Sequence, residues 1–238
     1  MYPNKQGALT ITNSLSTTGI PADPVCDSWG MSRGVPIDRY YIDAFLSRHA
    51  ADIRGHVLEI GDDGYSRRFG SPDVVDVLDI NPNNRAATIV ADLTNAPEVP
   101  SDMFDCVVVT QVLVLIADLR AAVETLIRIT KPGGVILATQ PAISRVSSLA
   151  GEYDNWCWSI YPAGARWLFS IKEIEQNVLL VEHYGNLRTV TAFLWGLAQE
   201  DLKEIDFLRH DHRYPLITAV RAVKRRNGSG HAADPGLS

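Results

Sequence analysis

Short apolar runs alternate with helical patterns along the middle of the chain, and this alternation restricts the fold more than any other feature. Residues 37–49 carry apolar side chains at helical spacing, whereas 56–60, 74–80 and 87–91 are short apolar runs typical of buried strands. A fourth run, residues 104–110 (FDCVVVT), is the clearest strand in the sequence. Such regular alternation predicts a layered α/β structure.

The next segments indicate how the strands are connected. A helix is expected over 119–130 and a strand over 135–139. The helix should stop at residues 131–134 (KPGG), because proline cannot continue a helix and glycine permits a tight turn. Parallel strands need helical crossovers, so we predict a doubly wound, Rossmann-like, mostly parallel sheet.

The last third of the chain has a different order. Helices are expected over 163–169 and 190–202, and strands over 178–184 and 216–223. Two late strands around one helix predict an antiparallel C-terminal edge on the sheet.

The chain is expected to hold one domain between two flexible ends. Its 238 residues suit a single α/β domain. Residues 1–27 are polar and lack sustained periodicity, and residues 226–238 are rich in small and polar types. We therefore predict a flexible arm over 1–27, one domain over 28–225 and a disordered tail over 226–238.

Composition argues against several classes of partner. The formal net charge is −6, and no basic stripe is long enough to follow a phosphate backbone, so nucleic acid is not expected. Three widely spaced cysteines lack metal-site spacing, and His210 and His212, two residues apart, have no further ligand cluster, so no metal is expected. Without a secretion signal or membrane-length apolar stretch, we expect a soluble cytoplasmic protein, monomeric or homodimeric.

Three predicted strands end in residues that suit an adenosyl ligand. The first ends at Glu59-Ile60-Gly61-Asp62-Asp63, where glycine permits a sharp turn and an acid can accept a hydrogen bond from an ammonium group. Adjacent acids would repel a pyrophosphate, and the glycine fingerprint of dinucleotide enzymes is missing. The alternative is an ordinary strand-to-loop turn with solvated acids.

The other two strand ends carry Asp79 and the pair Asp92-Leu93. Asp79 lies 18 residues after Gly61, where a carboxylate can accept both ribose hydroxyls. Asp92 can accept from an adenine amino group while Leu93 flanks the ring. Either acid is equally typical of a turn or helix cap.

Taken in order, these segments resemble a known family. The series VLEIG, VLDINP, VADLT, FDCVVVTQVLVLI and LIRITKPGGVILATQP is similar to the consecutive motifs of class I S-adenosylmethionine-dependent methyltransferases, over about residues 55–141. The first loop departs from the family pattern, with GDDGY in place of GxGxG. The flanking text RGVPIDRYYIDAFL and VLEIGDDGYSRRFG resembles a subgroup of small bacterial methyltransferases often encoded near glycosyltransferases, in which such a loop is typical.

The resemblance implies S-adenosylmethionine as cofactor and a set of contacts with it. Residues 59–63 would lie against the methionine part, Asp79 on the ribose, and residues 80 and 92–93 around the adenine. The implied cofactor residues are Tyr40, Glu59, Gly61, Asp62, Asp63, Asp79, Ile80, Asp92, Leu93 and Gln111.

The acceptor side is predicted from position and from aromatic content. Family members often place a lid before the first strand and acceptor contacts after the fifth, and aromatic walls there can hold a flat or sugar-like molecule. Plain packing is the alternative for these aromatics. The expected acceptor residues are Trp29, Arg39, Trp156, Trp158 and Tyr161, and the expected catalytic candidates are Tyr41, His183 and Tyr184.

The predicted function is methylation of a small-molecule acceptor, with an oxygen on a sugar or natural product favoured. A nitrogen or ring carbon of an aromatic compound such as an indole also suits an aromatic pocket. Two other classes were weighed: a nicotinamide-dependent oxidoreductase, which needs the missing glycine fingerprint, and a non-catalytic adenosyl-ligand binder.

Overall fold

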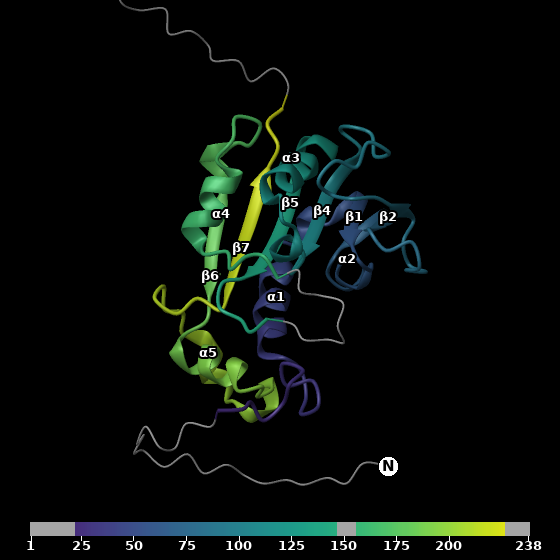
Figure 1. Cartoon of the computed structure of the whole chain (residues 1–238). Helices are drawn as coiled ribbons and strands as arrows, with labels where there is room; N and C mark the ends of the chain where they lie inside the picture. Colours follow the sequence, from purple (N-terminus) through teal and green to yellow (C-terminus); the bar gives the residue numbers. More distant parts are fainter. Residues whose placement is uncertain (1–21, 147–155, 227–238) are drawn as a thin grey trace, which may run out of the picture.

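Seven strands form one sheet at the centre of the molecule (Figure 1). The computed structural model describes residues 22–146 and 156–226. The strands stand side by side in the order β3-β2-β1-β4-β5-β7-β6. In chain order they are β1 (Arg54–Ile60), β2 (Ser71–Asp79), β3 (Ile89–Val90), β4 (Phe104–Thr110), β5 (Thr130–Pro141), β6 (Leu180–Tyr184) and β7 (Ile217–Val223).

The predicted α/β sheet is confirmed, including its antiparallel edge. β1 pairs in parallel with both β2 and β4, and β2–β3 and β4–β5 are parallel as well. β7 runs antiparallel to its neighbours β5 and β6. Because β1 to β5 all point the same way, their carboxyl ends share one edge of the sheet.

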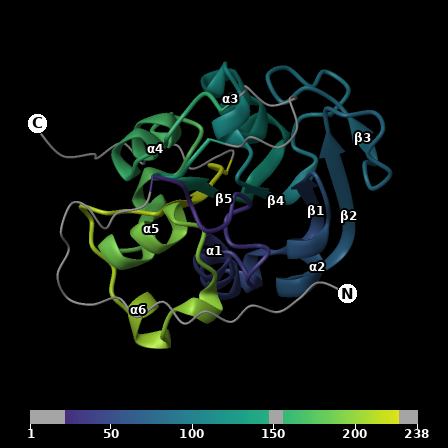
Figure 2. The same ribbon diagram turned by 60° about the horizontal axis from the view of Figure 1, so that its bottom comes forward.

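Helices cover both faces of the sheet, as Figure 2 shows. The helices are α1 (Ile37–Arg48), α2 (Gly64–Phe69), α3 (Leu119–Ile129), α4 (Pro162–Phe169), α5 (Leu187–Leu194) and α6 (Glu204–Leu208). The apolar core is accordingly split in two, with α3 and α4 packed on one face and α1 and α5 on the other. Among the described residues, no helix is both long and apolar enough to cross a membrane.

Successive side chains of β4 pack alternately into the two halves of the core. Cys106 and Val108 pack in the half under α1, while Val107 and Val109 pack in the half under α3. All four side chains are fully buried. An apolar run without polar alternation therefore marks a strand covered on both faces.

The predicted helix over 190–202 is wrong in its bounds. The helix runs over Leu187–Leu194, and the chain turns at Gly196, whose φ is +74°. A Cβ on Gly196 would lie 2.1 Å from the carbonyl oxygen of Cys26, so the turn lets the N-terminal segment pack closely. The predicted strand over 87–91 shrinks to two residues, and β5 begins already at Thr130, ahead of the KPGG segment.

The N-terminal segment is fastened to the end of α5. The Val25 N–H donates to the Trp195 carbonyl at 2.9 Å, and the Gln199 N–H donates to the Val35 carbonyl at 2.8 Å. Arg33 pairs with Asp201 at 2.6 Å. Within residues 22–27 of the expected arm, Cys26 is buried and Val25 is hydrogen-bonded, whereas 1–21 and 227–238 lie outside the described residues.

Asn186 ties α5 to α6. Its side-chain oxygen caps α5 by accepting from the Arg188 and Thr189 N–H groups, and its amide donates to the carbonyls of Asp206 and Arg209 at 2.8 and 2.7 Å. The residue is only 8% exposed. Its loss would therefore leave several backbone groups short of a partner.

We expect Asn186→Ala to lower the free energy of unfolding by about 2–4 kcal/mol, combining a lost cap with unpaired backbone carbonyls. Urea denaturation followed by circular dichroism measures the change. The exposed Asn83 provides the matched control, since Asn83→Ala should stay within about 0.5 kcal/mol. Equal effects of the two substitutions would contradict the role of Asn186.

Candidate functional site

Gly61 opens the carboxyl edge of the sheet at its centre. It follows β1 with φ +91°, and its N–H donates to the Leu78 carbonyl at 3.0 Å. A Cβ built on Gly61 would meet no atom within 4 Å. The backbone here faces open space that any larger side chain would fill, which is the arrangement a closely bound ligand needs.

Glu59 holds the loop that follows Gly61. The residue is 1% exposed, and its two carboxylate oxygens accept from the Tyr65 and Ser66 N–H groups at 3.1 and 2.7 Å. Burial raises the pKa of this carboxyl, and the hydrogen bonds from Ser66 and Tyr65 oppose that shift. Glu59 therefore shapes the predicted cofactor loop by fixing the start of α2.

Asp62 and Asp63 make local contacts within the GDDGY loop. Asp62 Oδ1 accepts from the Gly64 N–H at 2.8 Å, and Asp63 pairs with Arg67 one helical turn later. Asp62 is exposed and Asp63 half-buried. Both acids lie beside the open Gly61 backbone, and each also stabilises the turn into α2.

Asn84 is a site residue that the sequence analysis missed. Its side-chain Nδ2 donates to the Gly61 carbonyl and to Asp79 Oδ2, both at 2.6 Å. Asp79 Oδ1 accepts in turn from the Asn81 N–H at 2.9 Å. One amide thus links the ends of β1 and β2. The run NPNN after the second strand was the available signal.

The three residues predicted to contact the adenine differ in their exposure to solvent. Ile80 is 67% exposed beside Asp79, where its side chain is free to flank a ring. Asp92 is exposed, but its Oδ1 accepts from the Thr94 N–H and hydroxyl, the capping arrangement weighed as the alternative. Leu93 is only 4% exposed and packs in the core, so the prediction that its side chain faces a ligand is wrong.

A cavity of about 120 Å³ lies farther along the same edge. Four residues predicted from sequence line it together, namely Trp29, Arg39, Gln111 and Trp156. The remaining lining residues are Met31, Pro36, Asp38, Pro141, Ser144, Phe193, Leu216 and Ile217. Residues from the N-terminal segment and from the start of β7 therefore come together next to the ends of β4 and β5.

Gln111 marks the point where the cavity meets the centre of the sheet. It follows β4, the neighbour of β1, and has a φ of +60°, a strained value for a residue other than glycine. Its N–H donates to the Thr139 carbonyl at 2.8 Å, which holds it in that conformation. The ring of Trp29, another residue of the cavity wall, has its centroid 4.3 Å from the Arg145 guanidinium.

Trp158 and Tyr161, predicted for the same pocket, do not line the cavity. Trp158 is 43% exposed, and its indole N–H donates to the Ile116 carbonyl at 2.9 Å. Tyr161 is 48% exposed and precedes the first residue of α4. Of the three aromatic residues that were predicted from this segment, only Trp156 lines the cavity.

The predicted catalytic tyrosines are core residues. Tyr41 is fully buried and its hydroxyl donates to Thr189 Oγ1 at 3.2 Å, and burial raises its pKa to about 12. Tyr184 is 3% exposed, donates to Glu182 Oε2 at 2.8 Å, and has a pKa raised by the same cause. Neither hydroxyl reaches the cavity, so both predictions are wrong.

Two further predicted residues lie elsewhere. Tyr40 packs against Phe207 of α6, with ring centroids 4.3 Å apart. His183 lies on the edge strand β6, which β7 separates from β5. These residues were predicted from their position along the chain, which does not determine the direction of a side chain.

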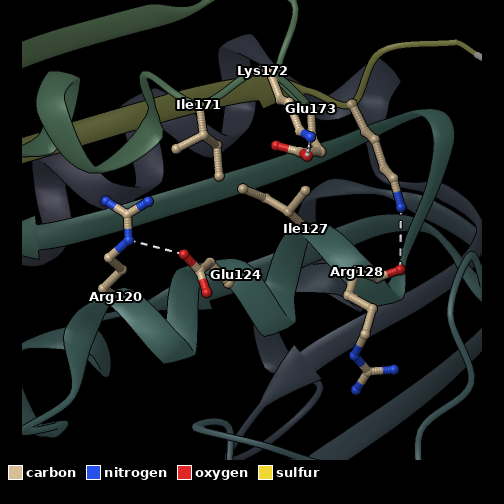
Figure 3. Close-up of a pocket in the computed structure, with 8 residues that line it drawn as sticks. Arg120, Glu124, Ile127, Arg128, Ile171, Lys172 and Glu173 are labelled. Atoms are coloured by element: carbon tan, nitrogen blue, oxygen red, sulfur yellow. Dashed lines mark hydrogen bonds and ion pairs between the residues drawn. The ribbon is translucent and has the colours of Figure 1, made fainter.

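A second pocket, of about 660 Å³, does not coincide with this site. Figure 3 shows it between α3 and residues 171–173, with Arg120 paired to Glu124 and Lys172 to Glu173. No predicted site residue lines it. Within the ranges 22–146 and 156–226, three or more side chains placed to hold a metal ion are not found together.

Comparison with known proteins agrees with this geometry. The family model described as a methyltransferase domain matches residues 38–184. Among solved structures, an S-adenosylmethionine-dependent methyltransferase from Archaeoglobus fulgidus is similar with a TM-score of 0.52 and 15% identity, over 78% of this chain and 94% of that one. No curated protein sequence matches the chain.

Two further structures share the fold. The complex of the Haloferax volcanii Trm112 methyltransferase activator with a putative methyltransferase has a TM-score of 0.52 and 18% identity, over 87% of this chain and 100% of that one. A Haemonchus contortus N-methyltransferase, solved with phosphomonomethylethanolamine and S-adenosylhomocysteine, has a TM-score of 0.53 and 16% identity, over 79% and 53%. The domain match covers more than half of the chain, which therefore belongs to the class I methyltransferases, enzymes whose cofactor is S-adenosylmethionine.

Proposed function

We propose that this enzyme methylates a hydroxyl group of a small organic acceptor, a sugar or another natural product. The observation that carries this proposal is the cavity lined by Trp29, Arg39, Gln111 and Trp156. It adjoins the open Gly61 backbone because β4, which ends before Gln111, lies beside β1. An acceptor in this cavity would be next to the methionine end of the cofactor.

The residues at the edge suit the cofactor. The open face of Gly61 admits close approach of the methionine part, and Asp79 offers oxygens to the ribose hydroxyls. Ile80 and Asp92 are exposed where the adenine would lie. When bound, S-adenosylmethionine supplies a methyl group already activated by the neighbouring sulfonium.

The protein's part is then mainly to position the acceptor and to exclude water. The acceptor atom must lie about 3–3.5 Å from the methyl carbon and in line with the bond that breaks. A cavity of about 150 Å³ accommodates benzene in another protein. The volume of about 120 Å³ found here therefore suits one small ring or a side arm of a larger molecule.

Methylation of a nitrogen or carbon on an aromatic compound, such as an indole, is the second candidate. The aromatic side chains of Trp29, Trp156 and Phe193 in the cavity wall favour it, because they can stack on a flat ring. An acceptor screen with phenols, sugars and indoles distinguishes these two possibilities by the position of the added methyl group.

We further propose a cytoplasmic protein, monomeric or homodimeric, that acts on small molecules and not on nucleic acid. Among the described residues, Cys26, Cys106 and Cys157 form no disulfide, which supports a reducing compartment. The net charge of −6 opposes attraction to a phosphate backbone.

Calorimetric titration tests the cofactor site directly. Purified protein should bind S-adenosylmethionine and S-adenosylhomocysteine, whereas NADH should give no heat, because the acidic Asp62-Asp63 loop repels a pyrophosphate. Circular dichroism confirms that the sample is folded. Failure of a folded sample to bind either adenosyl ligand would contradict the proposed site.

Asp79→Asn should weaken S-adenosylhomocysteine binding by about 1.5–3 kcal/mol, the usual contribution of hydrogen bonds to a charged group. The same titration measures it. Asp73, exposed on the same strand, is the control, and Asp73→Asn should bind normally. Unchanged affinity in Asp79→Asn would show that the ribose does not bind at Asp79.

Trp156→Ala should reduce kcat/KM for the acceptor while leaving S-adenosylhomocysteine affinity unchanged, because Trp156 lines the cavity and not the Gly61 loop. Steady-state kinetics with the acceptor from the screen measures the effect. Trp167 on α4 is 64% exposed, and Trp167→Ala should behave as wild type. A loss of S-adenosylhomocysteine affinity in Trp156→Ala would show that Trp156 contacts the cofactor and not the acceptor.

A further inference from the structure

One carboxylate in the cavity wall lacks a full set of partners. Asp38, in the first turn of α1, lines the cavity with Arg39 and Gln111 and is 8% exposed. Its Oδ1 is shielded from solvent and makes no hydrogen bond. Its Oδ2 lies 3.7 Å from the Arg39 guanidinium, which is too long for a hydrogen bond.

This arrangement costs stability in the free protein. Burial raises the pKa of Asp38, while Arg39 and the backbone N–H groups at the start of α1 lower it only in part, and Asp43 raises it further. The negative charge of Asp38 also contributes to raising the pKa of the Tyr65 hydroxyl on α2. Buried polar atoms are rarely left unpaired, so an orphan in a cavity wall indicates a missing donor.

We propose that Asp38 accepts a hydrogen bond from the acceptor hydroxyl and takes its proton during methyl transfer, an inference that rests on the proposed function. The acceptor's O–H bond breaks and a new O–C bond forms as the methyl C–S bond breaks, with that electron pair staying on sulfur. The proton passes to the Asp38 carboxylate and then to water. No further reagent is needed.

The position of Asp38 agrees with this role. Tyr41 and Tyr184, the hydroxyls considered from sequence, are held in the core, and His183 is on the far strand. Among the described residues that line the cavity, Asp38 is the only carboxylate. The substrate class is therefore a small molecule presenting a neutral hydroxyl beside an apolar ring.

A competing assignment gives Asp38 to the ammonium group of the cofactor. The two assignments predict different behaviour of Asp38→Asn. If the carboxylate held the ammonium, the variant would lose affinity for S-adenosylhomocysteine. If it meets the acceptor, this affinity stays within about two-fold, since a factor of two is well below the contribution of a charged hydrogen bond.

Thermal denaturation gives a second measurement that needs no acceptor. Because the folded-state pKa of Asp38 is raised, its ionisation costs stability as the pH rises past that value, and this cost is absent in asparagine. Asp38→Asn should therefore keep or raise the Tm at mildly alkaline pH. Asp52, paired to Arg221 at 2.7 and 3.0 Å, is the matched control, and Asp52→Asn should lower the Tm.

Turnover completes the test. With the acceptor from the screen, Asp38→Asn should lower kcat by about 10²- to 10⁴-fold, the usual contribution of a positioned base. Asp38→Glu should recover part of this loss because it restores the carboxylate. Full-length protein is used throughout, and methyl-labelled S-adenosylmethionine reports transfer.

Three results would overturn the proposal. A Tm loss in Asp38→Asn comparable to that of Asp52→Asn would show a structural role, and a ten-fold loss of S-adenosylhomocysteine affinity would show a cofactor role. Wild-type turnover in Asp38→Asn would exclude proton transfer to this group. Failure of the wild-type protein itself to bind S-adenosylhomocysteine would count against the proposed function and is separate from these results.

Discussion

Parallel pairing of β1 with both of its neighbours is the constraint on which the site depends. It brings the ends of β2, β1 and β4 to one edge, so Asp79, Gly61 and Gln111 meet although they are far apart in the chain. Glu59 and Asn84 then fix this edge, the first by binding the start of α2 and the second by joining Gly61 to Asp79. Buried hydrogen bonds of this kind contribute most by the cost of breaking them.

The cavity next to this edge is built on a different principle. Its walls come from the N-terminal segment, the end of β5 and the start of β7, and apolar packing closes it. The predicted cofactor residues lie in short polar loops that directly follow strands. The cavity walls, in contrast, come from segments that are far apart in the sequence, and no local sequence pattern shows that they come together. In the proposed function, methyl transfer takes place where the two meet, between Gly61 and Gln111.

The difference explains what could be predicted from the sequence. The strands and the residues at their ends follow from local patterns, and for this reason Gly61, Asp79 and Gln111 could be placed at strand ends from the sequence. Side-chain direction depends on tertiary packing, and Tyr41, Tyr184 and Leu93 were assigned to a ligand although they fill the core. Asp38 was missed because an acid in the first turn of a helix is ordinary, and only its burial without a partner is unusual.

The fastening of the N-terminal segment to the turn after α5 has a consequence for the order of assembly. The Val25–Trp195 and Val35–Gln199 hydrogen bonds join parts of the chain that a ribosome produces far apart in time. The strands that bear the cofactor edge emerge before the residues around Trp195 exist. The part of the cavity wall formed by Phe193, Leu216 and Ile217 can therefore assemble only after β1 to β5 have been synthesised.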